Sequence, residues 1–237
     1  MTATDASHKL AGDLLAFLQS WDATMAAEAA KIPIFRPELV KSWSAAQRQT
    51  FVQLLYHQRA HFHDVLWLMA SSAPDSESRE VILANIHEEV GKFGRSHESL
   101  YQDFAQDHGI DLSVEFVEEE FYEPFLRDYN RGHLRWLVAA PWLKRLVGFA
   151  VIERLDNVDY KSLLETARAM GTSPEALKFF KVHVAVQHFD AVGLEKLSSI
   201  WEASRPMVQE VFAELGAYQL EIWRKLAARV EQTVAQQ

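Results

Sequence analysis

The sequence predicts an all-α protein, a single bundle of about seven to eight helices. Only 9 Gly and 7 Pro occur among the 237 residues, and they fall between long segments. Within those segments the apolar residues recur at spacings of three and four, which is the period of an amphipathic helix. The chain therefore leaves almost no room for β-strands.

Proline and glycine mark the ends of the expected helices, at Pro33 and Pro37, Pro74, Gly91 and Gly94, Gly109, Gly132 and Pro141, and Gly171 and Pro174. The strongest start signal is Thr172-Ser173-Pro174-Glu175, in which a hydroxyl cap precedes a proline and a first-turn acid. The expected helices are 6–29, 45–71, 76–91, 95–107, 114–130, 142–169, 174–194 and 204–234. No linker or repeat divides residues 1–237, so one domain is expected.

Composition excludes several classes of protein. The chain has no Cys, which removes disulfides, thiolate metal sites and cysteine nucleophiles. The formal net charge of -9 opposes binding to nucleic acid. No apolar run reaches the length of a membrane span, and the first 20 residues lack a secretory signal. We therefore expect a soluble cytoplasmic protein with no nucleic-acid or membrane partner, whose metal ligands could only be His and carboxylates.

Two polar residues interrupt apolar helix faces in the first half of the chain. Glu89 lies within the stripe formed by Ile82, Ile86 and Val90, and His97 stands one turn before Leu100. The eight steps from Glu89 to His97 amount to about 80° of net rotation on a continuous helix, and the glycines between them allow further adjustment. The two side chains can therefore face one point.

Two further positions of this kind follow in the second half. Glu153 comes directly after the apolar run 146–152, where a buried acid without a partner would be costly. His183, Gln187 and Asp190 are spaced i, i+4 and i+7 and share one helix face. Carboxylates and imidazoles that project inward from several helices suit iron or manganese and leave coordination positions open for dioxygen.

These residues resemble the signature of a known family. Asn85-Ile-His-Glu-Glu89-Val-Gly91, followed by His97-Glu-Ser-Leu100, is similar to the N-x-x-x-E-x-G and H-x-x-L motifs of the haem-oxygenase-like di-metal oxidases and oxygenases. Glu153 and Phe179-Phe180-x-x-His183 follow in the family's order, and the resemblance covers about 21–197. It implies a haem-oxygenase-like bundle that binds non-haem iron through Glu89, His97, Glu153 and His183. Because relatives commonly pair, it also implies a homodimer.

The last helix departs from the family pattern H-x-x-x-[DE]-x-x-H, because Gln187 and Asp190 stand at its second and third positions. Glutamine is a neutral and weak ligand, whereas Asp190 offers oxygen where the family offers nitrogen. Both remain candidate ligands, of one or two iron ions or of manganese. The resemblance implies one ordinary metal position and a second that is weakened, altered or lost.

Other residues of the central helices are candidates for lining the site. Tyr56, His57 and Tyr160 are assigned to a substrate cavity, although aromatic residues at helical spacing are commonly plain core. His57 and His61, with His63 beside them, have metal-binding spacing, but nothing in the chain completes a second site around them. The acids of 115–123 point in successive directions around a helix, so most are expected to face water.

Three functions are compatible with these observations. The first is an iron-dependent oxidase or oxygenase that uses dioxygen to oxidise a small organic substrate. The second is a cofactor-independent enzyme on the same bundle, similar to the pyrroloquinoline quinone synthases, with His and Glu as acid and base. A thiaminase of this fold is disfavoured because the chain has no Cys. The third is a non-catalytic binding protein.

Overall fold

The computed structural model describes residues 12–91, 94–185 and 191–233, and within these ranges the chain is helical with no β-strand. The prediction of an all-α bundle is therefore confirmed. The elements are α2 (Gly12–Ala29), the 3-10 helix η1 (Pro33–Phe35), α3 (Pro37–Val40), α4 (Ala45–Ala60), α5 (Phe62–Ser72), α6 (Ser76–Glu89), α7 (His97–Asp107), α8 (Glu115–Glu118), α9 (Pro124–Ala139), α10 (Trp142–Ala169), α11 (Lys178–Ala185) and α12 (Ala191–Gln232).

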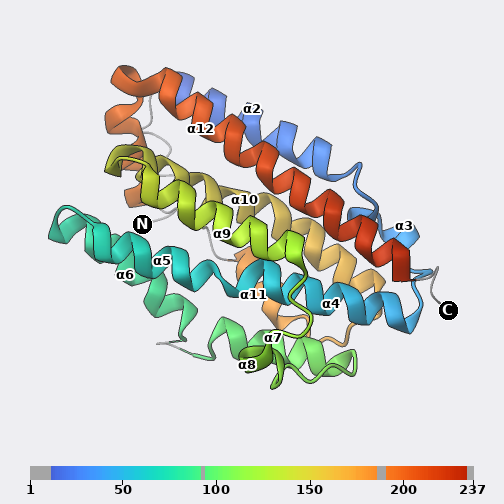
Figure 1. Cartoon of the computed structure of the whole chain (residues 1–237). Helices are drawn as coiled ribbons and strands as arrows, with labels where there is room; N and C mark the ends of the chain where they lie inside the picture. Colours follow the sequence, from blue (N-terminus) through green and yellow to red (C-terminus); the bar gives the residue numbers. More distant parts are fainter. Residues whose placement is uncertain (1–11, 92–93, 186–190, 234–237) are drawn as a thin grey trace.

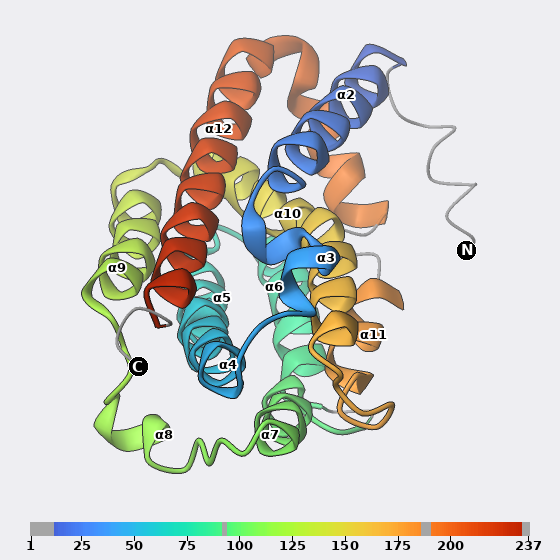
Figure 2. The same cartoon turned by 90° about the vertical axis from the view of Figure 1, so that its right-hand side faces the viewer.

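Helix α10 is the most extensively buried element of the bundle, and it packs against α12, α11, α2 and α3. Its buried residues include Val147, Val151 and Leu163, which point in several directions around the helix axis. A helix that is apolar nearly all round is stable only when neighbours cover it on most sides. The long α12 and α2 lie side by side along one edge of the molecule (Figure 1), and α7 and α8 lie at the opposite edge (Figure 2).

Two apolar clusters hold these helices together. The larger one joins α2, α4, α7, α10, α11 and α12 and contains Trp201, Trp223 and Phe212. The smaller one joins α5, α6, α9 and the first half of α10 and includes Leu66 and Met69. Burying such side chains contributes roughly 1.5–3 kcal/mol each. The two clusters thus position the α4–α5 segment and α6 against α10.

Several predicted helices agree with the structure, and two are divided. The ranges 76–91, 95–107 and 142–169 correspond to α6, α7 and α10. The predicted helix 45–71 is wrong as a single helix, because His61 leaves the helical conformation (φ -82°, ψ 3°) and separates α4 from α5. The ring of His61 stacks on Tyr122, with centroids 4.8 Å apart. This break depends on a tertiary contact and has no local sequence signal.

The predicted helix 114–130 and the predicted break at Gly132 are both wrong. Glu119 adopts a left-handed conformation (φ 49°) that ends α8, and Pro124 then begins α9 at its first helical position. Helix α9 continues through Gly132, where the hydroxyl of Tyr218 approaches so closely that a Cβ atom would clash with it. The glycine at this position allows close packing and does not end the helix.

The C-terminal half also differs from the prediction. Instead of beginning at 204, α12 runs from Ala191 through Pro206 to Gln232. Buried residues on both sides of the proline, Trp201 before it and Val208 after it, belong to one continuous core face. Tertiary packing thereby offsets the roughly 3 kcal/mol that an interior proline costs. Residues 6–11 of the predicted helix 6–29 and 186–190 of the predicted helix 174–194 lie outside the described ranges.

None of the helices in the described ranges is both long and apolar enough to traverse a lipid bilayer.

Gly148 allows α10 to approach α9 closely, and its substitution should destabilise the fold. A Cβ atom at this position would lie 2.5 Å from Cζ3 of Trp136. We expect Gly148→Val to lower the free energy of unfolding by about 1–3 kcal/mol through overpacking, measured by urea denaturation. The matched control is Ala84→Val on the exposed face of α6, which should cost about 0.5 kcal/mol through helix propensity alone. Equal losses in the two variants would contradict the close approach of Gly148 to Trp136.

Candidate metal centre

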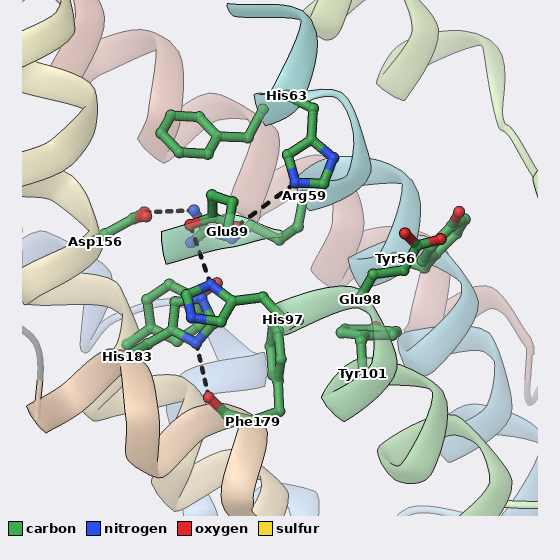
Figure 3. Close-up of a pocket in the computed structure, with 12 residues that line it drawn as sticks. Tyr56, Arg59, His63, Glu89, His97, Glu98, Tyr101, Asp156, Phe179 and His183 are labelled. Carbon is green, nitrogen blue, oxygen red and sulfur yellow. Dashed lines mark hydrogen bonds and ion pairs between the residues drawn. The ribbon is translucent and has the colours of Figure 1, made fainter. Parts of the chain in front are cut away.

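A cavity of about 110 Å³ opens where α4, α5, α6, α7, α10 and α11 meet. Aromatic rings form much of its wall, and Arg59, Glu89 and Asp156 lie together on one side of it (Figure 3). Its lining residues are Tyr56, Arg59, Phe62, His63, Glu89, His97, Glu98, Tyr101, Asp156, Tyr160, Phe179 and His183. Tyr56 and Glu98 lie together on the side away from Asp156 (Figure 3), and Glu98 is exposed to solvent.

Three of the predicted metal ligands come together in this cavity. Glu89, His97 and His183 each offer a ligand atom, and these atoms lie within 4.8 Å of one another. They come from the last residue of α6, the first residue of α7 and the middle of α11. We refer to these three residues as the Glu-His-His triad. Two imidazoles and one carboxylate that leave other positions open are the donor set typical of non-haem ferrous oxygenases.

The turn between α6 and α7 sets the distance between the first two members of the triad. Gly91 has φ +76°, and a Cβ atom there would clash with the backbone of Arg95 and Ser96. Ser96 then caps α7, since its side chain accepts a hydrogen bond from the backbone N–H of Ser99. The short connection brings Nδ1 of His97 within 3.0 Å of Oε1 of Glu89.

Two observations indicate that the triad fits a metal ion. Nδ1 of His97 is buried and makes no hydrogen bond within the described part of the chain, although a buried polar atom normally has a partner. It also lies 3.0 Å from the Glu89 carboxylate, about the separation of two donors that each bind one ion at about 2.1 Å and at a right angle. An ion coordinated by both residues would satisfy the buried nitrogen.

Helix α11 orients His183 toward the place where a metal ion would bind. Its Nδ1 lies 2.7 Å from the carbonyl oxygen of Phe179, one turn earlier in α11. Nδ1–H is therefore the donor, which makes Nε2 the unprotonated nitrogen of the ring, the tautomer common for metal-binding histidines. The ring also stacks on Tyr160, with centroids 3.9 Å apart. Both contacts restrict the imidazole to one orientation.

His63 is part of the site, although sequence analysis placed it only beside the His57–His61 pair. Its Nε2 lies 3.7 Å from Oε2 of Glu89, on the opposite side of that carboxylate from His97 (Figure 3). Burial raises the pKa of Glu89, but its contacts with His63 and His97 outweigh burial and hold the pKa well below its usual range. The close contact with the Glu89 carboxylate in turn raises the pKa of His63. Glu89 is thus kept ionised, the form that binds a cation.

Of the other three predicted metal ligands, the structure describes only Glu153. Glu153 is 1% exposed in the middle of α10, but it neither lines the cavity nor belongs to the triad. Gln187 and Asp190 lie outside the described residues. Of the four predicted ligands that the structure describes, it therefore brings together three.

Of the predicted cavity residues, Tyr56 and Tyr160 line the wall and His57 does not. His57 is buried behind it, where its Nε2 lies 2.6 Å from Oε2 of Glu115. Most acids of 115–123 were expected to face water, and Glu118 and Glu120 are exposed, whereas Glu115 is an exception that is 2% exposed. The pairing joins α4 to α8, a contact between residues 58 positions apart in the chain.

A buried ionic cluster beside the cavity was not predicted from the sequence. Nη1 of Arg59 donates to Asp156, and Nη2 lies 3.6 Å from Oδ2 of Asp159. Asp159 also accepts hydrogen bonds from Gln219 and Trp223 of α12. We refer to Arg59, Asp156 and Asp159 as the arginine cluster. A single arginine in a polar stretch such as His57-Gln58-Arg59 gives little sequence signal, because long side chains of this kind normally reach solvent.

The all-helical bundle and the Glu-His-His triad define a class of protein, a helical bundle with a candidate non-haem metal centre. The model of the family described as "iron-containing redox enzyme" matches residues 49–192. The chain belongs to this family. The matched range contains all three residues of the triad and all three of the arginine cluster.

A solved structure shares the fold. A domain of unknown function with a haem-oxygenase-like fold from Shewanella denitrificans matches with a TM-score of 0.69 and 18% identity, over 92% of this chain and 93% of that one. This likeness confirms the haem-oxygenase-like fold. Among curated proteins no sequence matches this chain.

Asp159 should make the stability of the protein depend on pH. Burial raises the pKa of its carboxyl to about 6, although Arg59, Gln219 and Trp223 favour the ionised form. An unfolded Asp has a pKa of about 3.9, so the folded state holds the proton more tightly. The stabilisation is complete below pH ~4 and is lost as pH rises through about 6, a change of about 3 kcal/mol.

Asp159→Asn cannot ionise and should lack this loss of stability. We expect the free energy of unfolding of the variant, relative to the wild type, to rise by about 3 kcal/mol between pH 4 and pH 7. Urea unfolding at several pH values measures this difference. If the free energies of unfolding of the wild type and the variant change equally with pH over this range, Asp159 does not ionise there.

Proposed function

We propose that the chain is one catalytic domain, a non-haem iron-dependent oxidase or oxygenase that uses dioxygen to oxidise a small organic substrate. The observation that carries this proposal is the Glu-His-His triad on the wall of an aromatic cavity. Membership in the family of iron-containing redox enzymes supports it. Iron is the expected ion, and manganese would suit the same oxygen and nitrogen donors.

Each member of the triad has a defined part in holding the ion. Glu89 supplies the negative charge, His97 contributes its buried Nδ1, and His183 contributes Nε2. Bound ferrous iron would supply the electrons for dioxygen reduction, chemistry that the side chains of a Cys-free chain do not provide. Contacts from His63 to Glu89 and from Phe179 to His183 keep the ligands in place.

The surrounding side chains would shape the reaction by excluding water and limiting substrate size. Tyr101 is buried and fixed by a hydrogen bond of 2.6 Å from its hydroxyl to the carbonyl oxygen of Val52. Phe179 and Tyr160 pack around His183. Rigid aromatic walls keep bulk water away from a reactive centre, which favours oxidation of the bound substrate over side reactions.

A second ion would need ligands beyond the triad. Glu153 is buried on α10 and is the candidate from the described part of the chain, and Gln187 and Asp190 are the candidates on the last helix of the family motif. Gln187 brings no negative charge, so a second ion at this position would be held more weakly than the first.

Removing one imidazole of the triad should abolish iron binding and dioxygen consumption. We expect His183→Ala to bind ferrous iron at least 100-fold more weakly than the wild type, because two remaining donors do not hold the ion firmly. Elemental mass spectrometry of anaerobically reconstituted protein measures the iron, and an oxygen electrode measures dioxygen uptake.

The matched control for this experiment is His108→Ala. His108 is a part-buried histidine at the end of α7 that bonds to Thr172 and does not line the cavity. Iron content and dioxygen uptake should be unchanged in this variant. Unaltered turnover in a folded His183→Ala protein would contradict the proposal and favour a metal-free enzyme, and no tight iron in the wild type would favour a binding protein.

Glu153→Ala should decide how many ions the site holds. If Glu153 is a ligand of a second ion, the wild type should contain close to two equivalents of iron and the variant close to one. If the centre is mononuclear, both should contain one equivalent. The control is the free energy of unfolding of the two metal-free proteins. If it is similar in both, a lower iron content reflects the loss of a ligand and not the loss of the fold. Two equivalents in both proteins would show that Glu153 is not a ligand.

A further inference from the structure

Glu98 differs from the other two acids that line the cavity, because no basic side chain contacts it in the described part of the chain. Asp156 is bonded to Arg59. Glu89 contacts two imidazoles and is the carboxylate that a metal ion would neutralise. The wall of the cavity therefore carries one negative charge, that of Glu98, for which the fold supplies no counter-charge.

This charge lies at the open side of the cavity, next to an aromatic pair. Glu98 is exposed to solvent and lines the cavity on the side where Tyr56 and Tyr101 lie (Figure 3). The two tyrosine rings have centroids 5.7 Å apart, and the hydroxyl of Tyr101 is fixed by its hydrogen bond to Val52. A carboxylate beside aromatic rings suits an ammonium ion, which gains both Coulomb attraction and a cation–π contact.

The electrostatic potential at this side of the cavity is negative. Burial raises the pKa of Tyr56, and the negative charge of Glu98 raises it further. Glu115 in α8 and Glu119 just after it act in the same direction. A potential of this sign attracts cations and repels anions such as carboxylates.

An aromatic wall leads from this side of the cavity to the triad. The ring of Tyr101 packs edge-on against Phe179, with centroids 4.9 Å apart. Phe179 in turn contacts the ring of His183, with centroids 4.5 Å apart. An alkyl chain whose ammonium group lies at Glu98 would run along this wall with its far end toward the triad. The cavity volume of about 110 Å³ admits only a short chain.

We propose that Glu98 and Tyr56 bind the ammonium group of a short aliphatic amine at the open side of the cavity. That the chain of this amine is oxidised at its far end rests on the proposed function, whereas ammonium binding does not depend on it. The proposal assigns a substrate class, small alkylammonium ions, and names the two residues that select it.

The experiment compares three small probes on metal-free protein at pH 7 and low salt: n-propylammonium, the neutral 1-propanol and the anionic propionate. NMR titrations give a dissociation constant for each probe. We expect the wild type to prefer n-propylammonium to 1-propanol by about threefold to thirtyfold, because an exposed ion pair and a cation–π contact each contribute modestly. Propionate should bind no better than 1-propanol.

Removing the charge of Glu98 should remove its share of the preference. We expect Glu98→Gln to reduce the preference by about twofold to fivefold, and the double variant Glu98→Gln/Tyr56→Leu to abolish it. Binding of 1-propanol should persist in both, which shows that the cavity remains folded. The matched control is Glu80→Gln. Glu80 is an exposed acid of α6 that does not line the cavity, so this variant should keep the wild-type preference.

Three results would overturn the proposal: no binding of n-propylammonium, equal affinity for n-propylammonium and 1-propanol in the wild type, or a preference that survives in the double variant. The last result would place the cation at another acid, such as Glu89 of the metal-free triad. Because the titrations use metal-free protein, they are independent of iron binding. Ammonium selectivity in a protein that binds no iron would support this site and contradict the oxidase, and iron-dependent dioxygen uptake without that selectivity would contradict this site alone.

Discussion

The buried guanidinium of Arg59 is the interaction on which the centre of the molecule depends. It joins α4 to two acids of α10, and one of these acids is bonded in turn to α12. A charge in the interior is tolerated only with such partners, because losing them leaves an uncompensated ion. The arginine cluster thereby joins three helices in an otherwise apolar core. The cavity opens directly beside it.

The three triad residues lie at helix ends or on a short helix around this cluster. Glu89 closes α6, His97 opens α7, and His183 lies on the eight-residue α11, so none of them depends on the register of a long helix. Neighbours supply their rigidity: His63 contacts Glu89, the carbonyl of Phe179 accepts from His183, and Tyr160 stacks on its ring. The long helices provide the frame, and the short ones present the ligands.

The family resemblance identified the triad from the sequence, because the motif around Glu89 and His97 and the later His183 keep the family's order. His63 and Arg59 were not recognised as parts of the site. Each is separated from its partner by a long stretch of chain, 26 residues from His63 to Glu89 and 97 from Arg59 to Asp156. Local spacing carries no information about such pairs. The same reason explains why His57, predicted to line the cavity, instead pairs with Glu115.

The sequence by itself determined the helical class, the boundaries of α10 and the residues that form the triad. Those features depend on periodicity and motif order, which are local properties of the chain. Only the tertiary structure decided that α12 continues through Pro206, that α9 continues through Gly132, and that His61 divides α4 from α5. Each of these outcomes depends on packing between distant segments, which is strong enough to override the local preference of a proline, a glycine or a histidine.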